Sequence, residues 1–455
     1  MSGYYIENFG CRAAQADGAA IERQLAGQGM RRVVMQEADV VVLNTCTVTS
    51  AADQDARAAI RKVHRERPAA KILVTGCYAQ RAPDEIARLE GVAWVVGNSH
   101  KNQIGNIVGE TYSNFVPVSL LGQDTRQLSP EIYASDIFAH TELLAAPVFD
   151  SIERTRPNLK VQDGCDNRCS FCVIPFVRGQ SRSLPLDSVL REIEELERAG
   201  YKEVVVSGIN LGRWGRDFAH PRHFVDLLHE VLRRSSMEKL RLSSIEPMDW
   251  SDELIGLMAS SPRIAKHAHI PLQSGSDRIL RAMHRKYRPW HYAEKIERVR
   301  AAMPTAAIGA DVMVGFPGET KEQFEESRKF IEELPFSYLH VFTYSPRPGT
   351  PAAAVPAQVP IAVSRDRNRM LRAISAAKNL AFRSSFMGHT LQAITLSRAD
   401  ADKTDALSDN YLKVEIDGQW EPNRWMRVHV QSATEQGLRA AIESGDTPKL
   451  LAPER

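Results

Sequence analysis

A short run of cysteines in the middle of the chain is the strongest chemical signal in the sequence. It reads Cys165-Asp-Asn-Arg-Cys169-Ser-Phe171-Cys172 and follows a candidate strand and an Asp-Gly turn. Three thiolates at this spacing can ligate three irons of a four-iron cubane and leave the fourth iron open to a further ligand. A zinc knuckle is the alternative, but structural zinc takes four closed ligands, usually in C-x2-C pairs. The spacing therefore favours an iron–sulfur cluster.

The other three cysteines, Cys11, Cys46 and Cys77, lie far apart near the N-terminus. Each stands in a polar or glycine-bearing turn directly after a short apolar run of the kind that forms a buried strand. Parallel strands place ligands beyond their carboxyl ends, so these three turns can converge on a metal. The alternative is that they are ordinary buried thiols, because cysteine packs well in cores. Polar turns are not obvious sites for apolar packing, so we expect a second metal site.

The elements that must position the N-terminal cysteines alternate along residues 1–115, which we expect to form one small α/β domain. Apolar runs predict strands at 4–7, 40–43, 72–74 and 93–96, and helical spacing predicts helices at 15–29, 51–66 and 83–89. This alternation is typical of a parallel sheet with helical crossovers. From 101 to 156 the pattern weakens, and we expect little regular structure there, with a linker at 116–150.

A longer alternation follows over residues 151–360. Strands are predicted at 159–162, 203–207, 239–243, 268–272, 308–314 and 338–344, with amphipathic helices at 186–199, 224–234, 252–260, 290–302 and 320–334. Six such units fit a barrel or an open partial barrel, whose active site would lie at the carboxyl ends of the strands. Asn210, Glu246 and Gln273 stand at predicted strand ends, so each is a ligand contact or a structural polar residue. His267 and His269 alternate on one strand, and we expect them to pack or cap rather than to bind metal.

The C-terminal part begins with a basic helix at 361–385, where six cations face one acid, Asp366. The six cations are Arg365, Arg367, Arg369, Arg372, Lys378 and Arg383. The helix is either a solvated face or an RNA contact. Runs at 390–396, 411–416 and 427–431 predict a small antiparallel barrel over 386–455. That segment has eight Lys and Arg against eleven Asp and Glu, so its total charge does not favour RNA.

Composition bounds the class of protein. With 455 residues, 43% of them hydrophobic and 25% charged, the chain is an ordinary globular protein of two to four units. The net charge is only +2, so any nucleic-acid binding must come from local patches. No apolar run approaches the roughly 18 to 20 residues of a membrane helix, and no secretory pattern opens the chain. We therefore expect a cytoplasmic protein with no membrane partner.

The cysteine run with Phe171 before its third cysteine resembles the cluster motif of the radical S-adenosylmethionine enzymes. The resemblance implies that the open iron binds S-adenosylmethionine and that one electron splits it to methionine and a 5′-deoxyadenosyl radical. It also implies a partial barrel, with the strand-end segment of Gly208 and Asn210 near the cofactor. Phe171, Gly208, Asn210, Glu246 and Gln273 are then the expected cofactor-binding residues.

Together with the N-terminal cysteines, the whole chain resembles the methylthiotransferases within that superfamily. This implies a second four-iron cluster on Cys11, Cys46 and Cys77, and a TRAM-like C-terminal β-domain that binds RNA. Strings at 44–49 (NTCTVT), 75–80 (TGCYAQ), 241–247 (RLSSIEP) and 409–412 (DNYL) resemble the branch that acts on threonylcarbamoyladenosine in tRNA. Ala14 departs from the family, which usually has Asn three positions after its first cysteine.

The resemblance implies a function: insertion of a methylthio group at C2 of N6-threonylcarbamoyladenosine, next to the anticodon. The cofactors would be two [4Fe-4S] clusters and S-adenosylmethionine, with Cys165, Cys169 and Cys172 as the catalytic cluster ligands. The partners would be the tRNA anticodon arm and a flavodoxin-like or ferredoxin-like electron donor. We expect phosphate contacts from the basic helix and from Arg178, Arg182 and Arg285. The alternatives are an enzyme for isopentenyladenosine or a ribosomal-protein aspartate, and a zinc-stabilised RNA-binding protein without catalysis.

Overall fold

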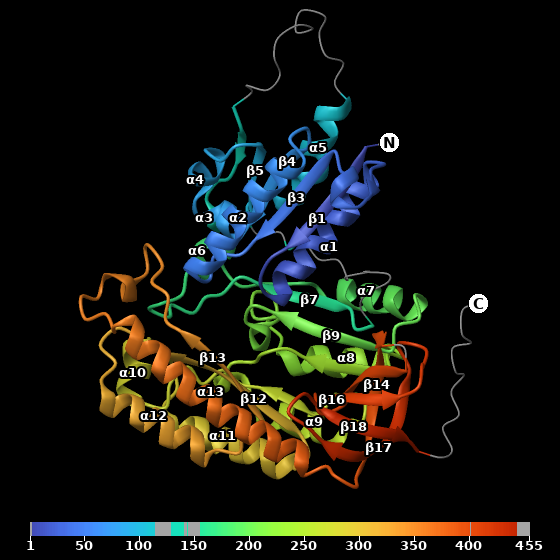
Figure 1. Cartoon of the computed structure of the whole chain (residues 1–455), viewed down its shortest axis with the longest axis vertical. Coiled ribbons are helices and arrows are strands. Elements are labelled where there is room, and N and C mark those ends of the chain that lie inside the picture. Colours follow the sequence, from blue (N-terminus) through green and yellow to red (C-terminus); the bar gives the residue numbers. More distant parts are fainter. Residues whose placement is uncertain (1, 114–128, 141–142, 144–154, 401, 444–455) are drawn as a thin grey trace, which may run out of the picture.

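The N-terminal domain is a six-stranded, fully parallel sheet in the order β2-β1-β3-β4-β5-β6 (Figure 1). The computed structural model describes residues 2–113, 129–140, 143, 155–400 and 402–443. The strands are β1 Gly3–Asn8, β2 Arg31–Arg32, β3 Val40–Thr45, β4 Lys71–Gly76, β5 Val92–Gly97 and β6 Glu131–Tyr133. The helices are α1 Arg12–Gly27, α2 Ser50–Glu66, α3 Cys77–Arg81, α4 Pro83–Ala87 and α5 Ile104–Ser113.

Alternating side chains of the central strands divide between two cores. Val41 and Leu43 pack with Ile60 of α2 on one face of the sheet, whereas Val40 and Val42 pack with α1 and α5 on the other. A strand buried on both faces reads as a continuous apolar run, which is why the sequence predicted these strands well. The parallel α/β domain is confirmed.

The expectation of little regular structure from 101 to 156 is wrong in two places. Residues 104–113 form α5, and residues 131–133 form β6, which adds an edge strand to the sheet within the segment expected to be a linker. Two glycines weaken the helical signal of α5, and three residues are too few to show strand periodicity. The rest of the expected linker, at 116–128, 141–142 and 144–150, lies outside the described residues.

The central domain contains six parallel strands, as expected. They are β7 Asn158–Asp163, β9 Glu203–Gly208, β10 Lys239–Leu242, β11 His267–His269, β12 Ala307–Val314 and β13 Tyr338–Thr343. They form two sheets, β10-β9-β7-β8 and β11-β12-β13, joined by a parallel bridge between Leu240 and Ile264. The short β8 Arg182–Ser183 runs antiparallel to β7. The strands therefore make an open partial barrel with one apolar core between strands and helices.

Helices cover the outside of this partial barrel (Figure 1). The five predicted ones are present as α7 Leu186–Arg198, α8 Phe224–Arg234, α9 Asp252–Ser260, α11 Pro289–Ala302 and α12 Lys321–Glu333. Two short helices, α6 Ile174–Arg178 and α10 Asp277–Ala282, were not predicted. The basic segment forms α13 Ile361–Ser384, which lies along β13, because Asn368 and Ser375 bond to the backbone of that strand.

The C-terminal domain is a closed five-stranded barrel in the order β14-β15-β16-β18-β17. Its strands are β14 Thr390–Asp400, β15 Lys403–Ser408, β16 Lys413–Asp417, β17 Trp425–Ala433 and β18 Leu438–Ile442. The expected small β-barrel is confirmed, with one correction: β16 and β18 pair in parallel, because the chain crosses over β17 before it returns. Within the described part of the chain, no helix has the length and apolarity to cross a membrane.

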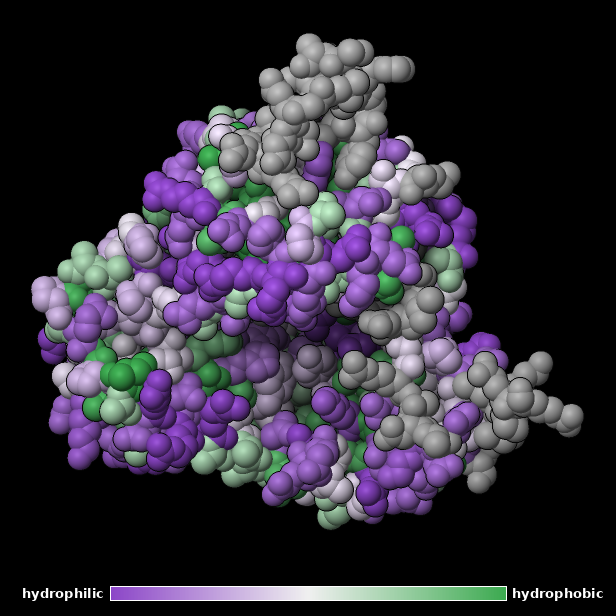
Figure 2. All heavy atoms as spheres, turned by 45° about the horizontal axis from the view of Figure 1, so that its top comes forward, coloured by the Kyte–Doolittle hydropathy of each residue, from purple (hydrophilic) through white to green (hydrophobic). Residues whose placement is uncertain are grey.

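Polar side chains join the three domains. Asp53 of α2 pairs with Arg347 after β13 (2.8 Å), and Asn158 of β7 donates to the carbonyl of Arg12 (2.7 Å). Arg241 of β10 donates to the carbonyl of Asp409 in the C-terminal barrel (3.0 Å). Figure 2 shows hydrophilic side chains gathered where the N-terminal domain meets the rest of the molecule, around a recess in that face.

Candidate cysteine metal centres

The three N-terminal cysteines lie at the carboxyl ends of three adjacent strands. Cys11 caps the start of α1 after β1, Cys46 follows β3 directly, and Cys77 opens α3 directly after β4. The sheet order places β1, β3 and β4 side by side. All three cysteines are free thiols, with Cys46 and Cys77 buried and Cys11 exposed. The structure thus gathers three residues that are separated by about thirty positions each in the sequence.

Electrostatics shows that these thiols share one site. Burial raises the pKa of Cys46 to about 11, and the neighbouring Cys77 and Cys11 add to the rise. Burial also raises the pKa of Cys77, which Cys11 raises further and Arg178 opposes. Three thiols whose charges disfavour one another need a cation to become thiolates together. A metal ion or cluster meets that need.

The backbone around the N-terminal cysteines approaches them closely. Gly10 has φ of +97°, and a Cβ there would lie 2.7 Å from Cβ and 3.0 Å from Sγ of Cys46. Gly76, before Cys77, has φ of +94°, and a Cβ there would lie 2.4 Å from the carbonyl oxygen of Thr45. Both positions therefore require glycine. These two glycine turns hold the backbone close to the cysteines, as a group bound by all three sulfurs would require.

Asn98 is a further polar residue at a strand end, and the sequence did not single it out. Its side-chain amide lies 3.6 Å from Cys77 Sγ and donates to the carbonyl of Val177 (2.7 Å). Asn98 directly follows β5, so it stands at the same sheet edge as the cysteines. Its place at a strand end was the signal that could have identified it.

The second cysteine group occupies the loop after β7. The Cys165 amide donates to the carbonyl of Gly179 (3.0 Å), and the Cys172 amide donates to the carbonyl of Cys169 (3.1 Å). Burial raises the pKa of Cys172 to about 12, and Cys169 and Cys165 raise it further. Burial and Cys169 likewise raise the pKa of Cys165. These three thiols also share one site.

Two predicted cofactor residues lie beside this loop. The Asn210 amide lies 3.7 Å from Cys165 Sγ, and its buried Oδ1 has no hydrogen-bond partner among the described residues. Glu246 forms an ion pair with Arg285, whose Nη1 donates to Cys169 Sγ (3.2 Å). Glu246, Arg285 and Cys169 line one hollow together with Arg213 and Tyr287. An unpaired acceptor and an ion pair beside the sulfurs fit a ligand that carries amino and carboxylate groups.

The remaining predicted cofactor residues stand at different distances from the sulfurs. Gly208 supports Asn210 indirectly: a Cβ at Gly208 would lie 2.9 Å from Gln162 Oε1, which accepts from the backbone N–H of Asn210 (2.7 Å). Phe171 packs edge-on against Phe316, with ring centroids 6.4 Å apart. Gln273 has a left-handed φ of +65°, and no described side-chain contact brings it to the cysteine loop.

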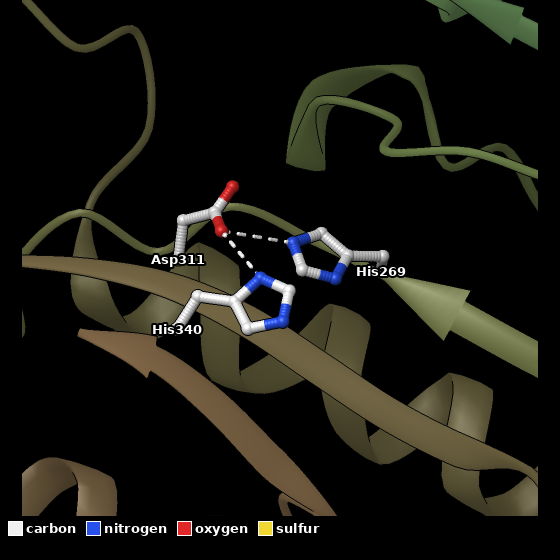
Figure 3. Close-up of side chains that lie close together, drawn as sticks. All are labelled: His269, Asp311 and His340. Carbon is white, nitrogen blue, oxygen red and sulfur yellow. Dashed lines mark hydrogen bonds and ion pairs between the residues drawn. The ribbon is translucent and has the colours of Figure 1, made fainter. Parts of the chain in front are cut away.

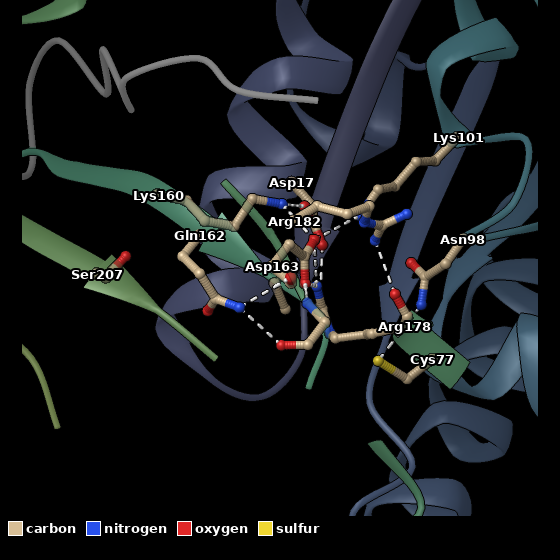
Figure 4. A network of polar contacts seen from close by, with 12 residues as sticks. Asp17, Cys77, Asn98, Lys101, Lys160, Gln162, Asp163, Arg178, Arg182 and Ser207 are labelled. Carbon is tan, nitrogen blue, oxygen red and sulfur yellow. Dashed lines mark hydrogen bonds and ion pairs between the residues drawn. The ribbon is translucent and has the colours of Figure 1, made fainter. Parts of the chain in front are cut away.

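A buried network of charges lies beside Cys77 of the N-terminal cysteine group (Figure 4). Arg178 donates to Asp17 of α1 (2.9 Å) and to Asp163 of β7 (2.9 Å). Lys101 lies 3.0 Å from Asp17, and Lys160 lies 2.8 Å from Asp163 and also contacts Asp17. All five side chains are buried. Three cations face two carboxylates, so one positive charge is left over beside the thiols of Cys77 and Cys11.

The network also sets the protonation of its carboxylates. Burial alone would raise the pKa of Asp17, but Lys101, Lys160 and Arg178 outweigh it and lower that pKa to about 2. The same balance holds the pKa of Asp163 well below its usual range, with Arg178 as the largest lowering influence. Asp163 lies two residues before Cys165, so the network joins one cysteine group to the other.

The expected phosphate contacts need correction. Arg178 and Arg285 are buried in the interactions above, and Arg182 donates to the carbonyls of His140 (2.8 Å) and Arg178 (2.7 Å). Arg367 in α13 is also buried, against Glu319 (2.5 Å). Carboxylates or carbonyls within the protein engage each of these arginines, so we no longer expect them to contact phosphate.

Exposed cations are present on α13 and at the rim of the hollow beside Cys169. In α13 they are Arg365, Arg369 and Arg372, of which Arg369 pairs with Asp366 (2.8 Å). At the rim of the hollow beside Cys169 they are Arg168 and Lys286, which sequence reasoning did not single out.

Two different family models match the N-terminal domain and the central domain. A family model described as the Radical SAM superfamily matches residues 159–331, and one described as Uncharacterized protein family UPF0004 matches residues 3–97. The chain is 34% identical over 424 residues to threonylcarbamoyladenosine tRNA methylthiotransferase MtaB of Aquifex aeolicus, covering 93% of this chain and 98% of that protein. It is 37% identical to the protein of the same name from Bacillus subtilis, covering 92% and 91%.

A differently named relative is nearly as similar. The tRNA-2-methylthio-N(6)-dimethylallyladenosine synthase of Syntrophobacter fumaroxidans is 35% identical, covering 83% of this chain and 82% of its own. Among solved structures, the radical S-adenosylmethionine methyltransferase TsrM of Kitasatospora setae superposes with a TM-score of 0.57 at 16% identity, covering 77% and 75% of the two chains. The likeness to TsrM is one of fold.

Proposed function

This chain belongs to the radical S-adenosylmethionine methylthiotransferase family, and we propose that it inserts a methylthio group at C2 of N6-threonylcarbamoyladenosine next to the anticodon of tRNA. The observation that carries the proposal is the pair of cysteine groups, each gathered at strand ends and joined by the Asp17–Arg178 network. Relatives named for this substrate match more than nine-tenths of the chain, which supports the choice of nucleoside.

The target chemistry explains why such a chain needs cofactors. C2 of adenine is an aromatic carbon with a strong C–H bond, which no side-chain acid or base of this chain can activate. When bound, two [4Fe-4S] clusters and S-adenosylmethionine supply radical and sulfur-transfer chemistry, with an electron from a flavodoxin-like or ferredoxin-like donor. The protein binds, orients and shields these groups.

Each site residue has a role in this proposal. Cys165, Cys169 and Cys172 would hold one cluster, and Cys11, Cys46 and Cys77 the other. Asn210 and Glu246 would hold the amino-acid end of S-adenosylmethionine, because the Asn210 side-chain amide lies beside Cys165 Sγ and Glu246 lines the hollow that also contains Cys169. Arg285 would act as a positioning residue, since it donates both to Glu246 and to Cys169 Sγ. Phe171, Gly208 and Gln273 would complete the surroundings of the cofactor.

We also propose that tRNA lies across the three domains. The target base must be unstacked in a single-stranded loop, which suits the anticodon arm. Phosphate contacts would come from the exposed cations of α13, because the C-terminal barrel segment carries a net negative charge. We propose the division into an N-terminal domain (1–115), a linker (116–150), a barrel (151–360), a basic helix (361–385) and a β-domain (386–455), with the correction that β6 of segment 116–150 belongs to the N-terminal sheet.

Nucleoside mass spectrometry of tRNA from a deletion strain tests this function. We expect the 2-methylthio form of threonylcarbamoyladenosine to disappear and the unmodified nucleoside to accumulate. The wild-type gene restores the product, whereas a gene encoding Cys165→Ala or Cys46→Ala does not. Loss of 2-methylthio-isopentenyladenosine instead would assign the other tRNA substrate. Unchanged tRNA would overturn the proposal and favour a ribosomal-protein target or a zinc-stabilised RNA-binding protein.

A further inference from the structure

Three side chains from neighbouring strands of the barrel converge on one another in a group that contains none of the six cysteines. His269 ends β11, Asp311 lies within β12, and His340 lies within β13, directly opposite Asp311 in the register. Asp311 Oδ1 is 3.2 Å from His269 Nε2 and 3.3 Å from His340 Nδ1 (Figure 3). One ligand atom from each residue lies within 4.8 Å of the other two.

We propose that His269, Asp311 and His340 form a third metal site, which binds one divalent first-row cation such as Zn²⁺. Two imidazoles and one carboxylate are a donor set that Zn²⁺ and Fe²⁺ take in proteins. Bonds of about 2.0 to 2.2 Å in a tetrahedral site place ligand atoms roughly 3.3 to 3.5 Å apart. The two separations from Asp311, 3.2 and 3.3 Å, are close to that spacing, and the two histidine nitrogens lie within 4.8 Å of each other.

The surroundings of His269 suit a metal ligand. Its other ring nitrogen, Nδ1, lies 2.9 Å from the hydroxyl of Tyr338, which in turn lies 2.7 Å from His267 Nε2. Ligating histidines usually donate their second N–H to an oxygen, which orients the ring and leaves the first nitrogen free for the metal. The Tyr338 hydroxyl can accept a hydrogen bond from His269 Nδ1–H and donate its own hydrogen bond to His267 Nε2. Tyr338 is therefore a positioning residue of the proposed site.

The two histidines of β11 therefore have different roles. His267 stacks on Tyr411 with ring centroids 4.2 Å apart, which is the packing role expected from the sequence. His269 instead turns one nitrogen toward Asp311. The pattern of one strand cannot show this, because the other two donors come from β12 and β13.

The site is open on one side. Side-chain exposure rises from 7% at His269 through 24% at Asp311 to 52% at His340, so an ion can enter from the His340 side. With three protein ligands, at least one coordination position remains for water or an oxygen ligand. This is the arrangement of a reactive or ligand-binding ion rather than of a closed structural one.

Asp311 lies on the face of β12 that also carries a residue packed with the cysteine loop. Asp311 and Met313 alternate to the same face of β12, about 7 Å apart along the strand. Met313 packs in an apolar cluster that also contains Phe171 of the cysteine loop. A cation at Asp311 would therefore bind an oxygen atom of a molecule that enters the barrel beside that loop.

Zinc loading of the cluster-containing protein tests the site. Anaerobic protein is incubated with one equivalent of ZnCl₂ and desalted, and zinc is measured by mass spectrometry and by absorption at the zinc K edge. We expect about one zinc per chain with nitrogen and oxygen ligands at about 2.0 to 2.2 Å and no sulfur at about 2.3 Å. Iron content monitors the cysteine sites independently. Retention of no zinc, or of zinc with sulfur ligands, would overturn the proposal.

Variants separate this site from adventitious binding. Asp311→Asn and His340→Ala should each lose the zinc but keep their iron, and His340 is exposed enough that its replacement leaves the fold intact. Tyr338→Phe should weaken zinc affinity about 10- to 100-fold in competition with a chelator. The matched control is His429→Ala, which removes an exposed histidine from strand β17 and should keep the zinc. Full zinc retention in His340→Ala would contradict the site.

Discussion

Asp17→Asn is the most informative change to the buried network. Asp17 lies on α1 of the N-terminal domain and contacts Lys101, Lys160 and Arg178, the last two from the barrel domain. Asparagine preserves the shape of the side chain but removes its charge. Three buried cations would then face Asp163 alone. Removing one partner of a buried ion network costs about 3 to 5 kcal/mol, because an uncompensated charge remains away from water.

We therefore expect Asp17→Asn to lower the free energy of unfolding by about 3 to 5 kcal/mol, as measured by urea denaturation of cluster-loaded protein without oxygen. The matched control is Asp366→Asn, which breaks a pair with Arg369 in which both side chains are largely exposed. That control should change the free energy by less than about 0.5 kcal/mol. A loss below about 1 kcal/mol for Asp17→Asn would refute the reasoning.

The pH dependence of this difference is a second check on the same variant. The folded pKa of Asp17 is lowered to about 2, so its stabilising charge is present above the pKa of the unfolded chain and is lost only as pH falls toward 2. The gap between wild type and Asp17→Asn should therefore stay constant from pH 8 to pH 5. A gap that closes across this range would show that Asp17 titrates near its ordinary value.

Two further predictions concern the N-terminal cysteines and RNA. Gly10→Ala should lower iron from about eight to about four per chain, because its Cβ would lie 2.7 Å from that of Cys46. Gly29→Ala is the control, because Gly29 also has a positive φ but has no described atom within 4 Å of the added Cβ. Equal iron content in the two variants would contradict the argument that the added Cβ at Gly10 crowds Cys46. Replacing three exposed α13 arginines with alanine should weaken tRNA binding and flatten its salt dependence, and an unchanged dissociation constant across salt concentrations would remove α13 from the interface. These arginines are Arg365, Arg369 and Arg372.

Sequence patterns predicted the elements that bury continuous or periodic apolar faces. The strand at Val40–Thr45 and the helix at Phe224–Arg234 follow directly from such patterns. They also placed each N-terminal cysteine at a strand end, which the parallel sheet brings together. Periodicity did not reveal α5 and β6, whose glycines and short length weaken it.

The errors at the site arise from partners remote in the sequence. Arg178 resembles a surface cation locally, but it bonds to Asp17, 161 residues away, and becomes part of the interior. Arg367 pairs with Glu319, 48 residues away. His340 meets Asp311 only because β12 and β13 pair in one particular register. Local pattern identifies which residues carry charge, but tertiary pairing decides whether that charge reaches solvent.

Iron and sulfide content tests the central claim that this chain holds two separate four-iron clusters. The measurement compares wild type with two triple variants, one replacing Cys165, Cys169 and Cys172 by alanine and one replacing Cys11, Cys46 and Cys77. The account predicts about eight irons and eight sulfides per chain in wild type and about four of each in either variant. Zinc in place of iron, or iron that the N-terminal triple variant leaves unchanged, would contradict it.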